Sequence, residues 1–181
     1  YGVRCHEAIP LPAETHYTQP DAPVPGLLPP VTVATAFRGL PDAPSDVLAN
    51  HVGRAHGPAV IERYNNMAYG ERDSKTRINR LDPNKPSYTI VVGSDKGGGK
   101  GHVHPFLPRE VTPRESARIQ TFPDFWEFTG TSRHPIRQVG NAVPPLFAGV
   151  IASNLLRHGF GETDAPNYAE LVHRLGLTYL E

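Results

Sequence analysis

The sequence predicts an irregular α+β fold, in which a small β-rich segment is followed by a group of helices. Twenty prolines and seventeen glycines among 181 residues favour loops over long helices. Residues 88–92 are β-branched or aromatic and predict a strand. Apolar residues at helical spacing after residue 145 predict a helix. The length allows one domain or two small ones.

The N-terminal thirty residues predict an extended connector. They hold seven of the prolines, which lack an N–H and fix φ, so regular helix and central strand are excluded. Residues 31–41 then predict a short helix, with Thr32 as its cap and Gly39 near its end. The chain begins at Tyr1 rather than methionine, and residues 1–4 look like the tail of a strand. We therefore expect a preceding segment.

A β-hairpin is expected in the middle of the chain. Residues 50–75 are mostly polar and show little pattern. A proline-containing turn over residues 82–86 precedes the strand at 88–92, and residues 102–106 predict the returning strand. The intervening residues 93–101 are glycine-rich and predict a loop. This loop matches no Walker sequence.

The C-terminal third predicts helices. Thr112, Pro113 and Glu115 form a helix start with a capping box, and this helix should run to about Thr121. The later helix should end at Gly159. Its apolar repeat comprises Leu146, Val150, Ile151, Leu155 and Leu156. The tail carries a weaker amphipathic pattern of Leu171, Leu175 and Tyr179.

Charge is unevenly spread although the net charge is zero. Residues 54–118 hold twelve basic and seven acidic side chains, whereas the flanking segments are net acidic. A basic face is what contact with phosphates requires, and an ordinary solvated surface is the alternative. The mean hydropathy is −0.39, and no long apolar run or signal peptide is visible, so no membrane role is expected.

Few residues suggest chemistry on their own. Cys5 is the single cysteine, so no internal disulfide can form and a reducing, cytoplasmic compartment is expected. No proline precedes Cys5, and we expect a small structural residue rather than a nucleophile. His102 and His104 would share one strand face, but no third ligand is suggested. We therefore expect no metal site and no catalytic residue.

Two blocks near the C-terminus are the most specific features. Residues 113–124 read PRESARIQTFPD, and residues 138–145 read QVGNAVPP. Each has an ordinary interpretation as a capped helix, core aromatics or a helix entrance. Their order and separation, however, resemble the last two sequence blocks of the DNA cytosine-5 methyltransferases. That family also needs a Pro-Cys loop, a Glu-Asn-Val block and a glycine-rich cofactor motif, none of which occurs here.

The resemblance implies three regions. Residues 1–44 would be a connector and the end of the catalytic-domain sheet, and residues 45–106 a small β-rich target-recognition domain. Residues 107–181 would be helices that complete the S-adenosylmethionine-dependent methyltransferase α/β domain. The implied reaction transfers a methyl group from S-adenosyl-L-methionine to C5 of a flipped cytosine in a specific duplex, as in restriction-modification. The implied partners are double-stranded DNA and an N-terminal catalytic half, in the same protein or a separate subunit, in bacterial cytoplasm at the nucleoid.

The resemblance also suggests site residues. Asn141, Ala142 and Val143 would contact the cofactor, and we expect them at a helix start, where the dipole favours a carboxylate; a plain helix cap is the alternative. The expected structural residues are Arg109, Arg114, Glu115, Gln138 and Gly140. The expected DNA-binding residues are Arg77, Arg80, Lys85, Ser87, Thr89, Ser94, Lys96, Gly98, Lys100 and His102.

Two other functions stay open at this point. The chain could be a non-catalytic DNA-binding module derived from the family, in which case no neighbouring segment would carry the Pro-Cys and Glu-Asn-Val blocks. It could also be a structural or interaction domain. DNA affinity that falls with rising salt would then be missing.

Overall fold

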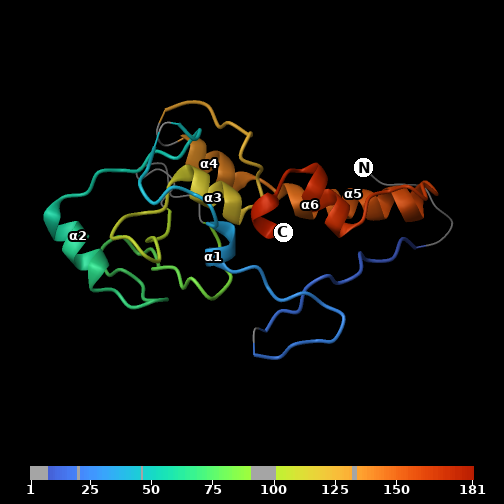
Figure 1. Cartoon of the computed structure of the whole chain (residues 1–181), viewed down its shortest axis with the longest axis horizontal. Helices are drawn as coiled ribbons and strands as arrows, with labels where there is room; N and C mark the ends of the chain where they lie inside the picture. The colour runs from blue at the N-terminus through green and yellow to red at the C-terminus, as the bar shows by residue number, and fades with distance from the viewer. Residues whose placement is uncertain (1–7, 20, 46, 91–100, 132–133) are drawn as a thin grey trace.

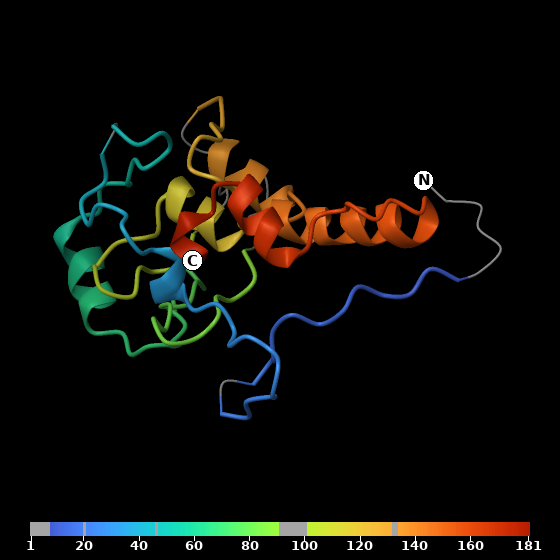
Figure 2. The same cartoon turned by 45° about the vertical axis from the view of Figure 1, so that its right-hand side comes forward.

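The computed structural model describes residues 8–19, 21–45, 47–90, 101–131 and 134–181. Helices α1 to α4 lie in one wide body, and α5 and α6 extend from it toward the opposite end (Figure 1). The N-terminal connector runs below α5 as an extended chain (Figure 2). The helical elements are α1 (Val33–Ala36), α2 (Pro58–Asn65), α3 (Pro113–Ile119), α4 (His134–Asn141), α5 (Pro145–Gly159), α6 (Tyr168–Arg174) and a 3₁₀ turn η1 (Thr178–Leu180).

The helices with clear local signals form where the sequence predicts them. Thr32 caps α1 by accepting a hydrogen bond from the Thr35 N–H at 3.2 Å. Helix α3 has both bonds of the capping box, between Thr112 and Glu115. Helix α5 begins at Pro145 and ends at Gly159. In these places local propensity and tertiary packing agree.

Helices α2 and α4 were not predicted. In α2 only Tyr64 is buried and Val60 packs partly against the same cluster, so the apolar face of this helix is too short to be recognised in the sequence. In α4 the buried residues Pro135, Ile136 and Val139 do follow helical spacing, but the segment is short and begins beside a turn. Tertiary contacts with α3, rather than propensity, hold α4 in place.

The β-rich domain is not supported by the described residues. They contain four isolated bridges and no strand. Val103 bridges Arg80, because its N–H donates to Asn79 O and its carbonyl accepts from the Leu81 N–H. It also bridges Glu110, through the bonds from the Val111 N–H to His102 O and from the His104 N–H to Arg109 O. Residues 88–90 are irregular, and Ile90 packs into the core instead of onto a sheet. Residues 91–100 of the expected hairpin lie outside the described residues.

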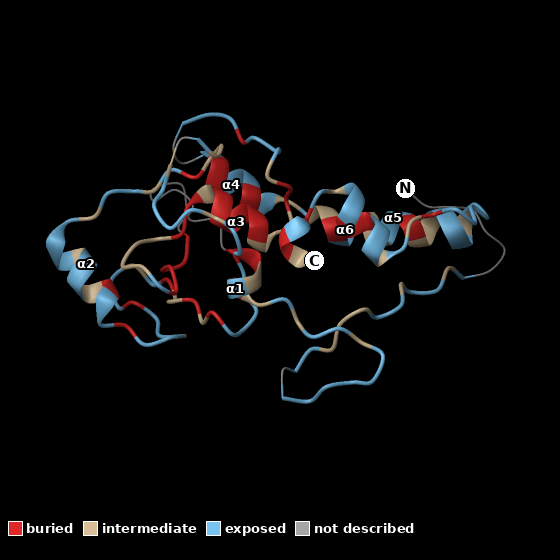
Figure 3. Ribbon diagram, in the orientation of Figure 1, coloured by how far each residue is buried: buried red, intermediate tan, exposed pale blue. Residues whose placement is uncertain are grey.

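Helix α3 lies at the centre of the core. Its Ala117 packs with Ile90, Phe122, Phe128 and Val139. Ile119 contacts both this cluster and a second one around α1. Figure 3 shows the buried surface concentrated on α3 and α4, whereas α5 has exposed faces. The body is therefore organised around the helix that carries the first specific sequence block.

One apolar stretch has the length and composition of a membrane-spanning helix. Residues His134–Gly159 are long and apolar enough to cross a bilayer by length and composition alone, and only 17% of the apolar window is buried. The stretch consists of two helices, because α4 ends at Asn141 and α5 begins at Pro145. The 15 residues of α5 rise about 22 Å, less than the ~30 Å of a bilayer core. Helix α5 has exposed apolar side chains, among them Phe147 and Ile151.

Candidate functional site

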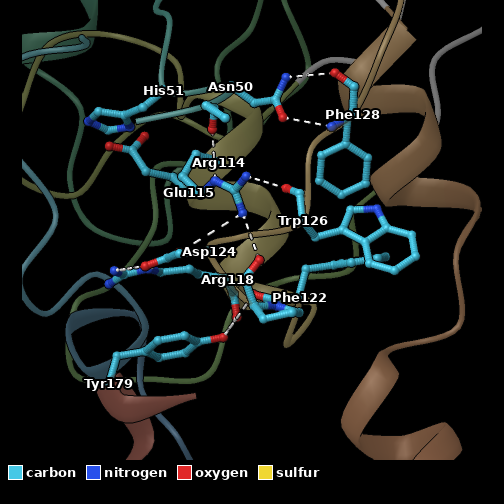
Figure 4. A network of polar contacts seen from close by, with 12 residues as sticks. Asn50, His51, Arg114, Glu115, Arg118, Phe122, Asp124, Trp126, Phe128 and Tyr179 are labelled. Atoms are coloured by element: carbon cyan, nitrogen blue, oxygen red, sulfur yellow. Dashed lines mark hydrogen bonds and ion pairs between the residues drawn. The ribbon is translucent and has the colours of Figure 1, made fainter. Parts of the chain in front are cut away.

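Arg114 is the centre of a buried polar network (Figure 4). Its side chain is fully buried and donates to the carbonyls of Ala49 at 2.9 Å, Pro123 at 3.0 Å and Trp126. Its own N–H donates to Asn50 O at 3.0 Å. These carbonyls come from both sides of α3, so one guanidinium fixes two loops against the helix start.

Asn50 extends this network to the second loop. Its side-chain Nδ2 donates to Phe128 O at 2.9 Å, and its Oδ1 accepts from the Phe128 N–H at 2.8 Å. The side-chain amide of Asn50 therefore forms two hydrogen bonds with the backbone of one residue, Phe128, in the way that two paired β-strand residues do. Asn50 has a positive φ of 65°, a conformation that asparagine tolerates better than most residues. The loop before α4 is thus held in a defined position.

Arg118, one turn further along α3, binds two residues that follow the helix, Asp124 and Tyr179. Its Nε donates to Asp124 Oδ1 at 2.9 Å, and a second bond reaches the other carboxylate oxygen. Its guanidinium also lies 4.7 Å from the ring centroid of Tyr179, whose hydroxyl donates to Arg118 O at 3.2 Å. Burial raises the pKa of Tyr179. The phenol therefore stays neutral and can keep donating.

Glu115 is the acceptor for a third set of contacts. Arg109 donates to both of its carboxylate oxygens, at 2.7 and 2.8 Å, and the Thr112 N–H donates at 2.7 Å. Burial acts to raise the pKa of Glu115, but these hydrogen bonds and the Arg109 charge outweigh it and lower the pKa. His104 Nε2 lies 3.5 Å from the same carboxylate. These groups pair with one another and not with solvent.

The expected structural residues thus have defined contacts. Arg109, Arg114 and Glu115 join α3 to segments on either side, as described above, and Gln138 Nε2 donates to Thr129 O at 2.7 Å. Sequence reasoning missed Asn50, His51 and Arg118. Their partners are mostly far apart in sequence, as in the bond of 3.0 Å between His51 Nδ1 and Thr112 Oγ1. No local pattern signals such pairs.

The predicted cofactor segment borders a surface hollow. The hollow has a volume of about 440 Å³ and is lined by His134, Arg137, Gln138, Asn141 and Ala142. Asn141 is exposed and Ala142 half-buried, so both can reach a ligand. Val143 is 61% exposed but is not among the lining residues. Gly140 lies one residue before Asn141 within α4.

The expected helix start at this segment is wrong. Asn141 is the last residue of α4, and the Ala142 N–H already donates to Val139 O at 3.3 Å. The next helix begins only at Pro145, after a proline that also lacks an N–H. Because a helix C-terminus carries partial negative charge, its dipole does not favour a carboxylate. The Asn141 carboxamide and the Arg137 guanidinium are the groups suited to bind one here.

Several predicted DNA-binding residues are exposed. Arg77 lies on a short hairpin-like loop beside α2, Lys85 lies 3.7 Å from Asp82 at the following turn, and Thr89 is exposed after that turn. Ser87 is half-buried, and its hydroxyl donates to Tyr88 O at 2.9 Å. Ser94, Lys96, Gly98 and Lys100 lie outside the described residues.

Two predicted DNA contacts have other partners in the structure. Arg80 donates from Nη1 to the carbonyls of residues 64, 65 and 67, and from Nε and Nη2 to Pro105 O, at distances between 2.7 and 3.3 Å. All three nitrogens of its guanidinium therefore bind backbone. His102 is 8% exposed, and its Nε2 lies 3.3 Å from Tyr88 O. Burial lowers the pKa of His102, so it is neutral and enclosed.

A metal site is not formed by the part of the chain that the structure describes. No group of three histidine, cysteine or acidic side chains gathers there. His102 and His104 are both buried. His104 Nδ1 accepts hydrogen bonds from the N–H groups of Phe106 and Leu107, each at 3.1 Å, so this nitrogen is already used.

A fold built around these two sequence blocks, with an exposed basic region and a hollow at the second block, fits a DNA methylase. The family model for C-5 cytosine-specific DNA methylase matches residues 42–157. The chain belongs to the C-5 cytosine-specific DNA methylase family.

Three similar proteins show how far the likeness extends. Type II methyltransferase M.AquIB of Picosynechococcus is 38% identical over 122 residues, which cover 58% of this chain and 85% of that relative. Type II methyltransferase M.BbvI of Brevibacillus brevis is 39% identical over 140 residues, covering 68% of this chain but 37% of that protein. An E. coli crystal structure, named as a prophage-encoded DNA modification methyltransferase, superposes with a TM-score of 0.60 at 31% identity, covering 71% of this chain and 47% of its own.

Proposed function

We propose that these residues form the DNA-reading and closing part of a DNA cytosine-5 methyltransferase whose reactive cysteine lies outside them. The family assignment supports the reaction class. Within this sequence the single cysteine, Cys5, follows Arg4 rather than proline. The chain spans about a third of the length of M.BbvI but most of the length of M.AquIB. The N-terminal catalytic half would lie in the same protein or in a separate subunit.

The proposed reaction methylates C5 of a flipped cytosine. A cysteine thiolate from the catalytic half adds to C6 and an acid supports the ring nitrogen; after methyl transfer, loss of the C5 proton and of the thiolate restores the ring. S-adenosyl-L-methionine supplies the methyl group when bound. In this chain the hollow beside Asn141 and Ala142 fits the edge of such a site, because it is open and offers an amide and a guanidinium. The remaining walls would belong to the catalytic half.

The exposed apolar face of α5 supports an N-terminal catalytic half as partner. Phe147 is 58% exposed and Ile151 38% exposed, and their spacing of four places them on one helical face. The buried residues of α5, Leu146 and Ser153, lie on a different face, and Leu146 packs with α6. A solvated phenylalanine and isoleucine on one face indicate a surface for another protein segment. We propose that residues 107–181 complete the catalytic domain through this face, in a cytoplasmic enzyme.

The three-region division remains our proposal. Residues 45–106 would contact duplex DNA through loops with exposed basic side chains. The described residues of this region form no β-sheet, so these loops do not connect strands. Arg77 and Lys85 are the described basic side chains from the predicted set that remain exposed. The four residues of that set within 91–100 keep the same proposed role.

Covalent trapping tests this function. The chain, the candidate catalytic half and their mixture are incubated with duplex DNA containing 5-fluorocytosine and S-adenosylmethionine. Because fluorine blocks loss of the C5 substituent, the thiolate adduct persists and shifts on a denaturing gel. We expect an adduct only in the mixture.

The other outcomes separate the alternatives. An adduct with this chain alone would refute the external nucleophile. Salt-sensitive DNA binding by the mixture without an adduct would favour a non-catalytic binding module. Absence of salt-sensitive DNA binding would favour a structural role.

A further inference from the structure

A loop next to α2 is built around one buried carboxylate. The Asp73 N–H donates to Ile78 O at 2.8 Å, and the Arg77 N–H donates to Asp73 O at 2.9 Å, so residues 73–78 form a tight hairpin-like loop. The loop tip, residues 74–77, is exposed apart from Thr76. It lies beside α2, at the end of the molecule farthest from the projecting end of α5 (Figure 1).

Asp73 holds this tip from the inside. Its side chain is 1% exposed, Oδ1 accepts from Arg63 Nε at 2.7 Å, and Oδ2 accepts from the Thr76 N–H at 2.7 Å and from the Thr76 hydroxyl. Burial acts to raise the pKa of Asp73, but the bonds from Thr76 and Arg63 outweigh it and lower the pKa. The carboxylate is therefore ionised, and both of its oxygens accept hydrogen bonds. These bonds hold the loop in one conformation.

The tip presents basic side chains in a fixed arrangement. Lys75 and Arg77 are exposed, and Arg72 uses its Nε to bind Arg77 O at 3.0 Å. Among the bonds of the described residues, none uses the terminal nitrogens of Arg72 or any side-chain nitrogen of Lys75 and Arg77. Arg77 has a φ of 64°, which glycine or asparagine would adopt with less strain. The strained backbone of this residue motivates the hypothesis that its side chain has a functional role.

We propose that residues 72–77 bind backbone phosphates of duplex DNA through Arg72, Lys75 and Arg77, with Asp73 as their positioning residue. This rests on the proposed function and gives it a specific contact surface. Three basic side chains within six residues fit successive phosphates better than a single base edge. A loop with its shape already fixed loses less conformational entropy on binding than a mobile one.

Salt-dependent DNA binding tests the phosphate contacts. The assembled methyltransferase is titrated against a fluorescein-labelled random-sequence duplex, and log Kd is plotted against log salt concentration. Arg77→Asn suits the positive φ and removes the charge, whereas Arg77→Lys keeps the charge at the same position. We expect the slope to fall by about one for Arg77→Asn, by about one for Lys75→Gln, and to stay unchanged for Arg77→Lys.

The positioning role of Asp73 predicts a change in DNA affinity opposite in sign to the change that simple electrostatics predicts. Asp73→Asn and the exposed control Glu62→Gln each remove one negative charge, so Coulomb attraction alone would tighten DNA binding in both. We expect Asp73→Asn to raise Kd by roughly fivefold and Glu62→Gln to leave it equal or lower. Thr76→Val, which keeps the backbone donor, should raise Kd by a smaller factor. It serves as the test if Asp73→Asn does not fold.

The outcomes distinguish the two levels of proposal. A wild-type enzyme without salt-sensitive binding would overturn the proposed function together with this loop. Normal wild-type binding with identical slopes for Arg77→Asn, Lys75→Gln and Arg77→Lys would overturn the loop alone. Tighter binding by both Asp73→Asn and Thr76→Val would refute the positioning role of Asp73.

Discussion

Arg109 and Glu115 form a two-bond ion pair in which both carboxylate oxygens accept from the guanidinium, at 2.7 and 2.8 Å. Glu115 is 1% exposed and also closes the capping box of α3. The same carboxylate therefore starts the central helix and joins it to the segment before it. Such a pair is costly to break from one side, because the remaining charge stays buried.

Glu115→Gln should therefore destabilise the fold strongly. The amide removes the charge that Arg109 needs and keeps the size of the side chain. We expect the free energy of unfolding to fall by about 3 kcal/mol. Urea titration measures it, with the exposed Glu62→Gln as the control, which should change it by less than about 0.5 kcal/mol. A similar small change in both variants would contradict the role of the pair.

His104 predicts a pH dependence of stability. Burial is the main cause that lowers its pKa from 6.5 to about 4, and the nearby Glu115 acts in the opposite direction. The unfolded chain therefore binds a proton near pH 6.5, whereas the folded chain does not until about pH 4. Stability should be full above pH 6.5 and fall as the pH falls toward 4, by an upper limit of about 3 kcal/mol.

Urea unfolding between about pH 7.5 and 5 measures this dependence, above the range where carboxylates are protonated. His104→Asn can keep an acceptor for the N–H groups of Phe106 and Leu107 without titrating. We expect a shallower dependence in this variant. Some slope should remain, because burial lowers the pKa of His102 as well. An unchanged slope would exclude His104 as a source.

Arg80 should behave as a structural residue. Its guanidinium binds carbonyls from residues 64, 65, 67 and 105, which a lysine ammonium cannot reach in the same fork geometry. Arg80→Lys should lower the free energy of unfolding by about 2 kcal/mol while leaving the salt slope of DNA binding unchanged. Denaturation and anisotropy titrations on the same variant measure both. A reduced slope with normal stability would return Arg80 to the DNA-contacting set.

Asn141→Ala should weaken S-adenosylmethionine binding more than DNA binding in the assembled enzyme. Loss of one amide contact corresponds to about 1 kcal/mol, or roughly a fivefold higher Kd by calorimetry. Asn66→Ala is a matched control, because Asn66 is also an exposed asparagine at a helix C-terminus, that of α2. Equal cofactor affinity in wild type and Asn141→Ala would reject this contact.

The sequence predicted the helices whose starts are determined by neighbouring residues. The capping box of Thr112 and Glu115 and the proline start of α5 need only neighbouring residues, so these helices were predictable. Arg80 was predicted as a phosphate contact, whereas its guanidinium donates to backbone carbonyls that no sequence pattern marks. Val103 has strand propensity, yet it forms two isolated bridges rather than part of a strand. For Asn141, the motif was recognised but the helix end was not.

The apolar face of α5 predicts how the chain associates. Phe147 and Ile151 share one face, and Leu156, 41% exposed, lies on roughly the opposite side of the helix at 100° per residue. Phe147→Glu should reduce co-purification with the catalytic half and abolish the 5-fluorocytosine adduct, because a carboxylate buried against apolar surface is strongly disfavoured. Leu156→Glu, with the same charge on the same helix, should leave both intact. Pull-down and denaturing gels measure them side by side. If both variants lose the adduct equally, the face is not the interface, and if neither does, α5 does not contact the catalytic half.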